Sequence, residues 1–66
     1  MKEEFAKRLI ELRLESNLSQ QEIANKLNIA RISYLHWKQG KTEPSINNIC
    51  KLCKILNVSA DYLLGL

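Results

Sequence analysis

The chain has 66 residues, of which 45% are hydrophobic and only four are aromatic, and its net charge is +3. A chain this short buries only about 60% of its unfolded surface, which leaves little stability for an elaborate pocket and argues against an enzyme. One proline and two glycines leave long helical runs uninterrupted, so we expect one compact all-α domain over residues 1–66.

The first predicted helix covers residues 3–16. Phe5, Leu9 and Leu12 recur at i, i+4 and i+7 and should face the core. Ile10 and Leu14 form a second apolar pair beside this stripe. Two roles stay open for that pair: partial burial under the C-terminal helix, or contact with a second subunit.

The second predicted helix begins at Gln20, because Ser19 and Glu22 have the spacing of a capping box. Its inward face is formed by Ile23, Ala24 and Leu27. Asn28 follows, and asparagine is the non-glycine residue that best tolerates the left-handed conformation in which helices often end. We therefore expect a short, one-sided helix followed by a turn.

The same pattern of helix end, apolar anchor and helix start occurs three times. The triplets are Asn17-Leu18-Ser19, Asn28-Ile29-Ala30 and Asn57-Val58-Ser59. Three asparagine stops imply at least four helices. Ala30 is the weak member, because it lacks the side-chain oxygen of serine, a deficit of about 1 kcal/mol. Water or a DNA phosphate would have to satisfy the free N–H groups there.

The third predicted helix has an outer face that a packed core does not need. Tyr34 and Trp37 lie on one side of a 3.6-residue wheel and should face inward, which makes core packing the expected role of Trp37. The opposite side carries Ile32, Leu35, His36 and Gln39, with Arg31 flanking them. A DNA major groove suits such a mixture, because arginine bonds guanine O6 and N7 and aliphatic groups contact thymine methyls.

Polar residues on both sides of this helix are candidates for phosphate contacts. Gln20 and Gln21 open the preceding helix, where amide side chains and free N–H groups can bind phosphate. Gln39, Lys41 and Thr42 stand at or just beyond the end of the third helix. The competing interpretation of these residues is an ordinary solvated surface.

The remaining chain predicts two more helices and no strand. Gly40 is a natural left-handed C-cap, and Pro44 prevents the helix from continuing. Ser45 then caps a fourth helix over residues 46–56. A short fifth helix follows Ser59, and its Tyr62, Leu63 and Leu64 can cover the first helix.

Cys50 and Cys53 form a CxxC pair inside the fourth predicted helix. The pair falls within an apolar pattern made up of Ile46, Ile49, Leu52, Cys53 and Leu56. Zinc would need two more ligands, and the only histidine lies elsewhere; a redox motif would normally accompany a βαβ pattern. We therefore expect both cysteines to pack in the core, and we expect no metal and no cofactor.

The positive charge is concentrated in the middle of the chain. Residues 26–54 carry six basic side chains against Glu43 alone, which suits a polyanionic partner as well as a plain solvated surface. The opening MKEEFAKRL lacks the apolar core of a signal peptide, and no run reaches the length of a membrane span. We expect a cytoplasmic protein with no membrane partner.

From Phe5 to Leu64 the sequence resembles the helix-turn-helix domain of phage repressor and Cro-like regulators, the Xre family. The matching features are Arg13, the run Leu18 to Ala24, the Asn28 turn, Trp37, Gly40-Lys41, Pro44-Ser45, Leu56 to Ser59 and Asp61 to Leu64. The resemblance implies a compact five-helix domain with its helix-turn-helix unit at about 19–39, acting as a dimer on a pseudo-palindromic operator. It also implies that Gln20 and Gln39 touch phosphate, and that Arg31, Ile32 and His36 read bases beside Leu35.

Three positions depart from the family pattern. Asn28 replaces a turn glycine, Ala30 lacks a cap, and Lys38 stands where the family has a glutamate that pairs with the arginine at position 13. Two facing cations cannot reproduce an ion pair. Our hypothesis is that Lys38 turns toward DNA phosphate or solvent while Arg13 finds another acceptor.

The sequence thus favours a sequence-specific double-stranded DNA-binding transcriptional regulator, a repressor acting as a homodimer. Two alternatives within DNA binding are an antitoxin and a controller of a restriction system. A third alternative is a protein-interaction module in which Ile32 and Leu35 contact a protein partner and DNA binding is lost. The enzyme class is the weakest, because the chain has one histidine, no paired carboxylates around it and no glycine-rich phosphate loop.

Overall fold

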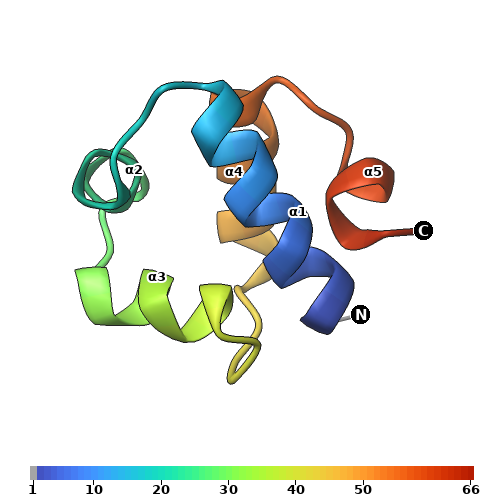
Figure 1. The fold of residues 1–66 in the computed structure, drawn as a ribbon, viewed down its shortest axis with the longest axis horizontal. Helices are drawn as coiled ribbons and strands as arrows, with labels where there is room; N and C mark the ends of the chain where they lie inside the picture. The colour runs from blue at the N-terminus through green and yellow to red at the C-terminus, as the bar shows by residue number, and fades with distance from the viewer. Residues whose placement is uncertain (1) are drawn as a thin grey trace.

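The computed structural model describes the backbone of residues 2–66 and the side chains from Glu3 onward. The described chain forms the following five helices: α1 (Lys2–Glu15), α2 (Gln20–Leu27), α3 (Arg31–Lys38), α4 (Ile46–Leu56) and α5 (Ala60–Leu64) (Figure 1). No strand occurs within it, so the predicted all-α, five-helix fold is confirmed. No helix over these residues combines the length and the apolar character that crossing a membrane requires.

The starts of α2, α4 and α5 follow from serine side chains. The hydroxyl of each capping serine accepts a hydrogen bond from the backbone N–H three residues later, at 3.0 Å for Ser19, 3.2 Å for Ser45 and 3.1 Å for Ser59. The Ser19 N–H in turn donates to Glu22 Oε1 at 2.9 Å, which completes the predicted capping box. These bonds satisfy N–H groups that have no partner inside the helix.

The helix ends follow from residues in the left-handed region. Asn17, Asn28 and Asn57 have φ values of 60°, 58° and 56°, as the three-fold sequence pattern predicts. Gly40 follows α3 with a φ of 74°, and the next N–H, of Lys41, donates to the His36 carbonyl at 2.9 Å. The chain therefore turns at positions that local chemistry selects.

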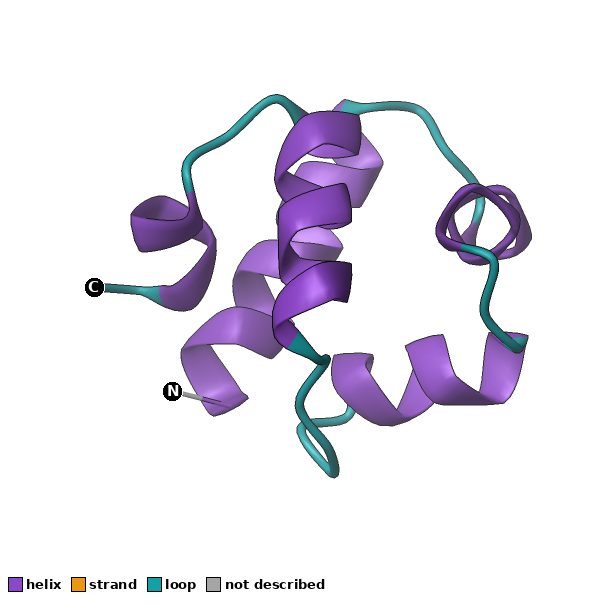
Figure 2. Ribbon diagram, turned by 180° about the vertical axis from the view of Figure 1, so that it is seen from behind, coloured by secondary structure: helices purple, strands orange, loops and turns teal. Residues whose placement is uncertain are grey.

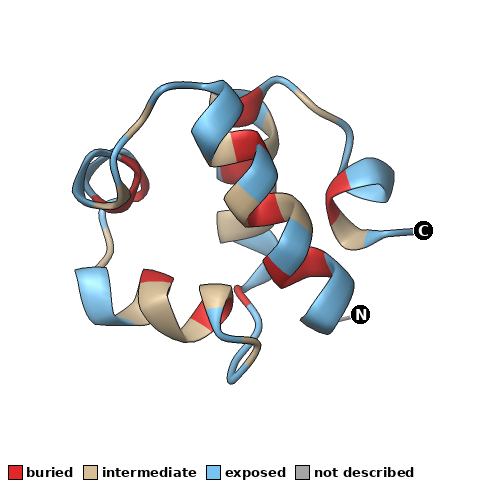
Figure 3. Cartoon of the chain, viewed as in Figure 1, coloured by how far each residue is buried: buried red, intermediate tan, exposed pale blue. Residues whose placement is uncertain are grey.

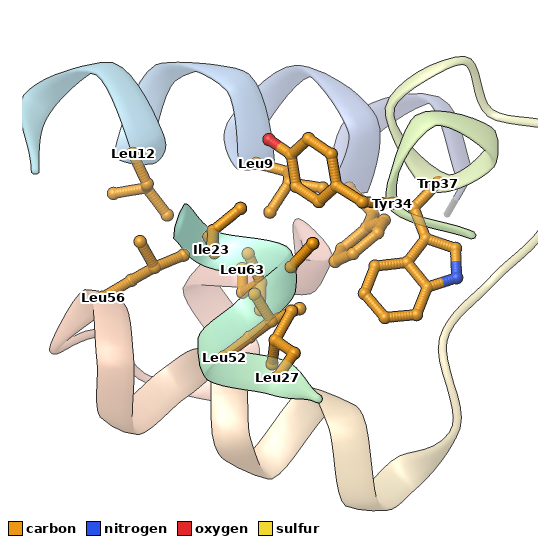
Figure 4. Close-up of a cluster of buried hydrophobic side chains, with 11 residues drawn as sticks. Leu9, Leu12, Ile23, Leu27, Tyr34, Trp37, Leu52, Leu56 and Leu63 are labelled. Atoms are coloured by element: carbon orange, nitrogen blue, oxygen red, sulfur yellow. The ribbon is translucent and has the colours of Figure 1, made fainter. Parts of the chain in front are cut away.

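One core joins all five helices. α1 packs against α3 and α5, α2 packs against α3 and α4, and α4 packs against α5 (Figures 1 and 2). The segments coloured as buried lie toward this common centre (Figure 3), and the close-up shows buried side chains meeting there (Figure 4). They are Phe5, Leu9, Leu12, Ile23, Ala24, Leu27, Tyr34, Trp37, Leu52, Leu56 and Leu63. The inward faces predicted for the first three helices are thus confirmed.

α5 packs against α1, as predicted. Its Leu63 is buried, whereas its Tyr62 is partly exposed. Leu63 is fully buried in the shared core. Tyr62 is 48% exposed, and the guanidinium of Arg8 lies 4.5 Å from the centre of its ring, a cation–π distance. Glu4 holds the same arginine from one turn earlier, with 3.7 Å between Oε2 and Nε.

Two residues of α4 that the sequence placed in the core are exposed instead. Ile46 is 79% exposed and Cys50 is exposed, whereas Cys53 is half-buried and packs against the core as expected. The buried face of α4 is centred on Leu52 and Leu56. Cys50 precedes Leu52 by two residues, about 200° around a 3.6-residue helix, and therefore lies on the opposite side. Core packing was the wrong role for Cys50 and Ile46.

Candidate nucleic-acid interface

α2 and α3 pack against each other and are connected by a three-residue turn, residues 28–30. In Figure 1, α2 is seen nearly end on while α3 runs across the view, so the two helices cross steeply. The N–H of Ile29 donates to the Ala24 carbonyl at 3.1 Å, and the Ile29 side chain packs against the core. The turn is therefore held both by a backbone hydrogen bond and by a packed side chain.

α3 has one face in the core and another in solvent. Tyr34 is fully buried and Trp37 is 5% exposed. Burial raises the pKa of the Tyr34 hydroxyl above its ordinary value, and the nearby positive charge of Arg13 partly offsets that rise. On the opposite side, Ile32 is 57% exposed and Gln39, seven residues later on the same face, is also exposed.

The ten residues predicted to bind DNA all belong to this unit and the loop that follows it, and none is buried. Gln21, Arg31, Ile32, Gln39, Lys41 and Thr42 are exposed. Gln20, Leu35, His36 and Lys38 are half-buried. Leu35 is thus less accessible than its place on the predicted outer face suggested. Arg31, Ile32 and Gln39 remain free to meet a partner.

The first turns of α2 and α3 differ in how their N–H groups are satisfied. Ala30 has the extended backbone of a capping residue, with φ of −70° and ψ of 145°, but provides no side-chain acceptor to α3. At the start of α2, Gln20 Oε1 is buried with no hydrogen-bond partner, while the Gln21 amide donates to Asn25 Oδ1 at 2.9 Å. A helix start that lacks a capping oxygen attracts an anion, because its N–H groups and dipole are positive.

The side chain of Arg13 bonds a backbone carbonyl rather than a carboxylate. Its Nη1 donates to the Leu18 carbonyl oxygen at 2.8 Å, across the turn between α1 and α2. Its Nε is buried without a partner, and Lys38 is half-buried. The first part of our hypothesis, a new acceptor for Arg13, agrees with this geometry.

The two cysteines form no metal centre with neighbouring side chains. Over the described residues, no three His, Cys, Asp or Glu side chains come together in a way that could hold a metal ion. Burial, and to a smaller extent the neighbouring Cys50, raise the pKa of the Cys53 thiol. A raised pKa reduces the thiolate fraction, and the thiolate is the reactive and metal-binding form.

A small apolar hollow lies at the junction of α1, α4 and α5, away from the α2–α3 turn. It has a volume of about 220 Å³. Its lining consists of Phe5, Glu43, Pro44, Ile46, Ile49 and Leu64. Sequence reasoning missed this surface because it assigned Ile46 to the core. The angle of about 120° between Ile46 and Leu52 on a 3.6-residue wheel was the signal that could have revealed it.

A helix pair joined by a three-residue turn, built on a five-helix core and presenting a solvent-facing second helix, defines a helix-turn-helix domain. The family model described as "Helix-turn-helix" matches residues 9–63. The chain belongs to this family, in its Xre, phage repressor and Cro-like branch.

Relatives and a solved structure agree with this assignment. The chain is 42% identical over 60 residues to YonR of Bacillus subtilis (strain 168), an SPbeta prophage-derived uncharacterized HTH-type transcriptional regulator, covering 91% of this chain and 56% of YonR. It is 39% identical over 61 residues to the HTH-type transcriptional regulator ImmR of the same organism, covering 92% of this chain and 48% of ImmR. The chain thus spans about half the length of the curated relatives it matches.

The fold is also similar to the crystal structure of the restriction-modification controller protein C.AhdI from Aeromonas hydrophila. The TM-score is 0.81 at 32% sequence identity, and the match covers 91% of both chains.

Proposed function

We propose that this chain is a sequence-specific double-stranded DNA-binding transcriptional regulator, a repressor that binds a pseudo-palindromic operator as a homodimer. The observation that carries the proposal is the outer face of α3, where exposed Arg31 and Ile32 precede half-buried His36. No structural role in the described chain requires an arginine and an exposed isoleucine there. The names of YonR and ImmR as transcriptional regulators support the same conclusion.

In this proposal α3 enters the major groove. Arg31 donates to a guanine edge, and His36 reaches a base one turn further along. Gln20 and Gln21 at the start of α2, and Gln39, Lys41 and Thr42 at the far end of α3, bind phosphates on either side. Lys38 contributes a further phosphate contact. The phosphate contacts set the position of the protein, and the residues on α3 select the sequence.

In this proposal the protein represses transcription by occupying the operator. In a homodimer, two α3 helices enter successive major grooves about 34 Å apart and exclude polymerase from the site. The hollow lined by Pro44 and Ile46 supports dimerisation, because it is apolar and begins in the loop that follows α3. Replacing Ile46 by aspartate should lower the dimer fraction in analytical ultracentrifugation. An unchanged sedimentation profile would exclude this surface.

A second candidate within DNA binding is the control of a restriction-modification system. The observation that favours it is the match to C.AhdI over 91% of both chains, in contrast to the half-length matches with the longer regulators. Expression from a promoter placed next to a restriction operon, with and without this chain, separates a controller from a phage-type repressor.

Selection of bound sequences from a random duplex pool tests DNA binding directly. We expect one enriched motif with two symmetric halves. On the selected DNA, Arg31→Ala should cost about 1–3 kcal/mol and relax selectivity at one base pair, whereas Lys41→Ala should weaken binding to selected and scrambled DNA alike. Lys7→Ala is the matched control, because this lysine is exposed on α1, outside the α2–α3 unit.

Two results would contradict the proposal. Equal losses for Arg31→Ala on selected and scrambled DNA would remove Arg31 from base recognition. Binding that persists or strengthens as salt rises would favour apolar docking to a protein, because phosphate-driven binding falls steeply with salt.

A further inference from the structure

α4 carries two thiols one helical turn apart at the edge of its buried face. Cys50 and Cys53 are separated by about 60° around the helix axis, so their side chains are neighbours on the helix surface. Cys50 is exposed and Cys53 is half-buried. Burial, and after it the charge of Cys50, raises the pKa of the Cys53 thiol, so the two sulfurs lie within electrostatic reach of each other. The pair is therefore a partly accessible dithiol.

The spacing of the two thiols suits a bridging ion better than a disulfide. Cβ atoms three residues apart on a helix are about 5–6 Å from each other. A disulfide needs about 3.5–4.5 Å between its Cβ atoms, so closing one inside a regular helix would distort the backbone. An ion between the sulfurs replaces one S–S bond of about 2.05 Å by two metal–sulfur bonds, each about 2.3 Å in zinc sites, and spans the longer distance.

The number of ligands selects the ion. Thiolates favour Cu(I), zinc and iron–sulfur clusters. Structural zinc and iron–sulfur clusters take four protein ligands. Among the described side chains, no three His, Cys, Asp or Glu come together in a way that could hold a metal ion, so the two thiols have no third ligand. Cu(I) forms stable complexes with two thiolates alone, and it is the ion that this pair can satisfy.

The charges of α4 favour such a complex. When Cu(I) binds two thiols, two Cu–S bonds form and two S–H protons leave to solvent, which gives a singly negative complex in which copper stays monovalent. α4 contains no acidic residue, and exposed Lys51 and Lys54 follow the two cysteines. A nearby positive charge stabilises the anionic form. We propose that Cys50 and Cys53 form a two-coordinate site for monovalent copper on α4.

Titration of the fully reduced protein with Cu(I), under oxygen-free conditions, tests the site. Bathocuproine disulfonate, a Cu(I) chelator that becomes coloured on binding, competes for the metal and reports how much the protein holds. We expect one copper per chain. X-ray absorption at the copper edge should show two sulfur neighbours and neither nitrogen nor oxygen. Cys50→Ser should lose this copper and remain folded, because the residue is exposed.

A variant that moves one thiol along the same helix is the matched control. Asn47→Cys combined with Cys50→Ser keeps two thiols on α4, and position 47 is exposed like position 50. The two thiols are then six residues apart, about 9 Å along the axis and on different sides of the helix, too far for one ion to bridge. We expect this variant to lose the one-to-one complex. It keeps Cys53 and the packing around it, and circular dichroism checks that it is folded.

Three results would overturn the proposal. Copper binding by the moved-thiol variant as tight as that of the wild type would show that the spacing of the pair plays no part. One copper shared by two chains, lost in Cys50→Ser and kept in Cys53→Ala, would move the site to a contact between two copies. Nitrogen or oxygen neighbours at the copper would exclude a site made of two thiolates. Because α4 contributes none of the residues proposed to bind DNA, each of these results leaves the DNA-binding function untouched.

Discussion

Ala30 begins α3 with the backbone of a capping residue but without its oxygen, and replacing it by serine should stabilise the fold. The φ and ψ angles are −70° and 145° at Ala30, against −77° and 165° at Ser19 and −67° and 164° at Ser45. The three positions agree within about 20°, close to the scatter of regular backbone. A serine at position 30 can therefore place its hydroxyl near the Ser33 N–H without moving the chain.

The expected gain in the free energy of unfolding is that of an ordinary serine cap. A serine cap is worth about 1 kcal/mol over alanine, within a range of about 0.5–2 kcal/mol. For a domain of this size, 1 kcal/mol raises Tm by roughly 4–8 °C. Ala30 is exposed, so the added hydroxyl displaces no packed atom. Ser45→Ala should show the same magnitude with the opposite sign.

Thermal and urea unfolding of the wild type, Ala30→Ser, Ser45→Ala and the double variant provide the measurement. The two caps belong to different helices, so their effects should add. The reasoning fails if Ala30→Ser leaves Tm unchanged while Ser45→Ala lowers it. That outcome would mean that the Ser33 N–H is already well satisfied by the Ala30 carbonyl oxygen, to which it donates at 3.0 Å.

Two further substitutions test the charges around the α2–α3 unit. Lys38→Glu should raise Tm, because it gives Arg13 a carboxylate partner. It should also weaken DNA binding, because it removes a proposed phosphate contact. A lower Tm would contradict the hypothesis that Arg13 bonds the Leu18 carbonyl because position 38 offers no carboxylate. The hydrogen bond from the Ser19 N–H holds the pKa of Glu22 below its ordinary value of 4.5. Because the folded-state pKa is depressed, the stabilisation by Glu22 is present above pH 4.5 and is lost as the pH falls through the folded-state pKa. Glu22→Gln should remove this part of the acid sensitivity in urea titrations between pH 3 and pH 6, and an unchanged pH profile would exclude the capping carboxylate as its source.

Most of the candidate site could be predicted from sequence because it depends on helix limits and helix faces. Arg31 and Ile32 lie outside the core because Tyr34 and Trp37, at helical spacing, lie inside it. The sequence could not reveal that Leu35 is half-buried while Ile32 is exposed. That difference depends on how neighbouring segments pack against α3, and the period of a single helix contains no such information.

The sequence by itself determined where α2, α4 and α5 begin and where α1, α2 and α4 end, because serine caps act over three residues and asparagine stops act at a single backbone position. Only the tertiary structure decided which part of α4 faces outward. α4 is apolar over more of its circumference than one core can cover, so its packing against α2 and α5 selects Leu52 and Leu56 and leaves Ile46 and Cys50 in water. The tertiary structure also decided which group Arg13 bonds. The Leu18 carbonyl comes within reach of its side chain because the chain turns at Asn17.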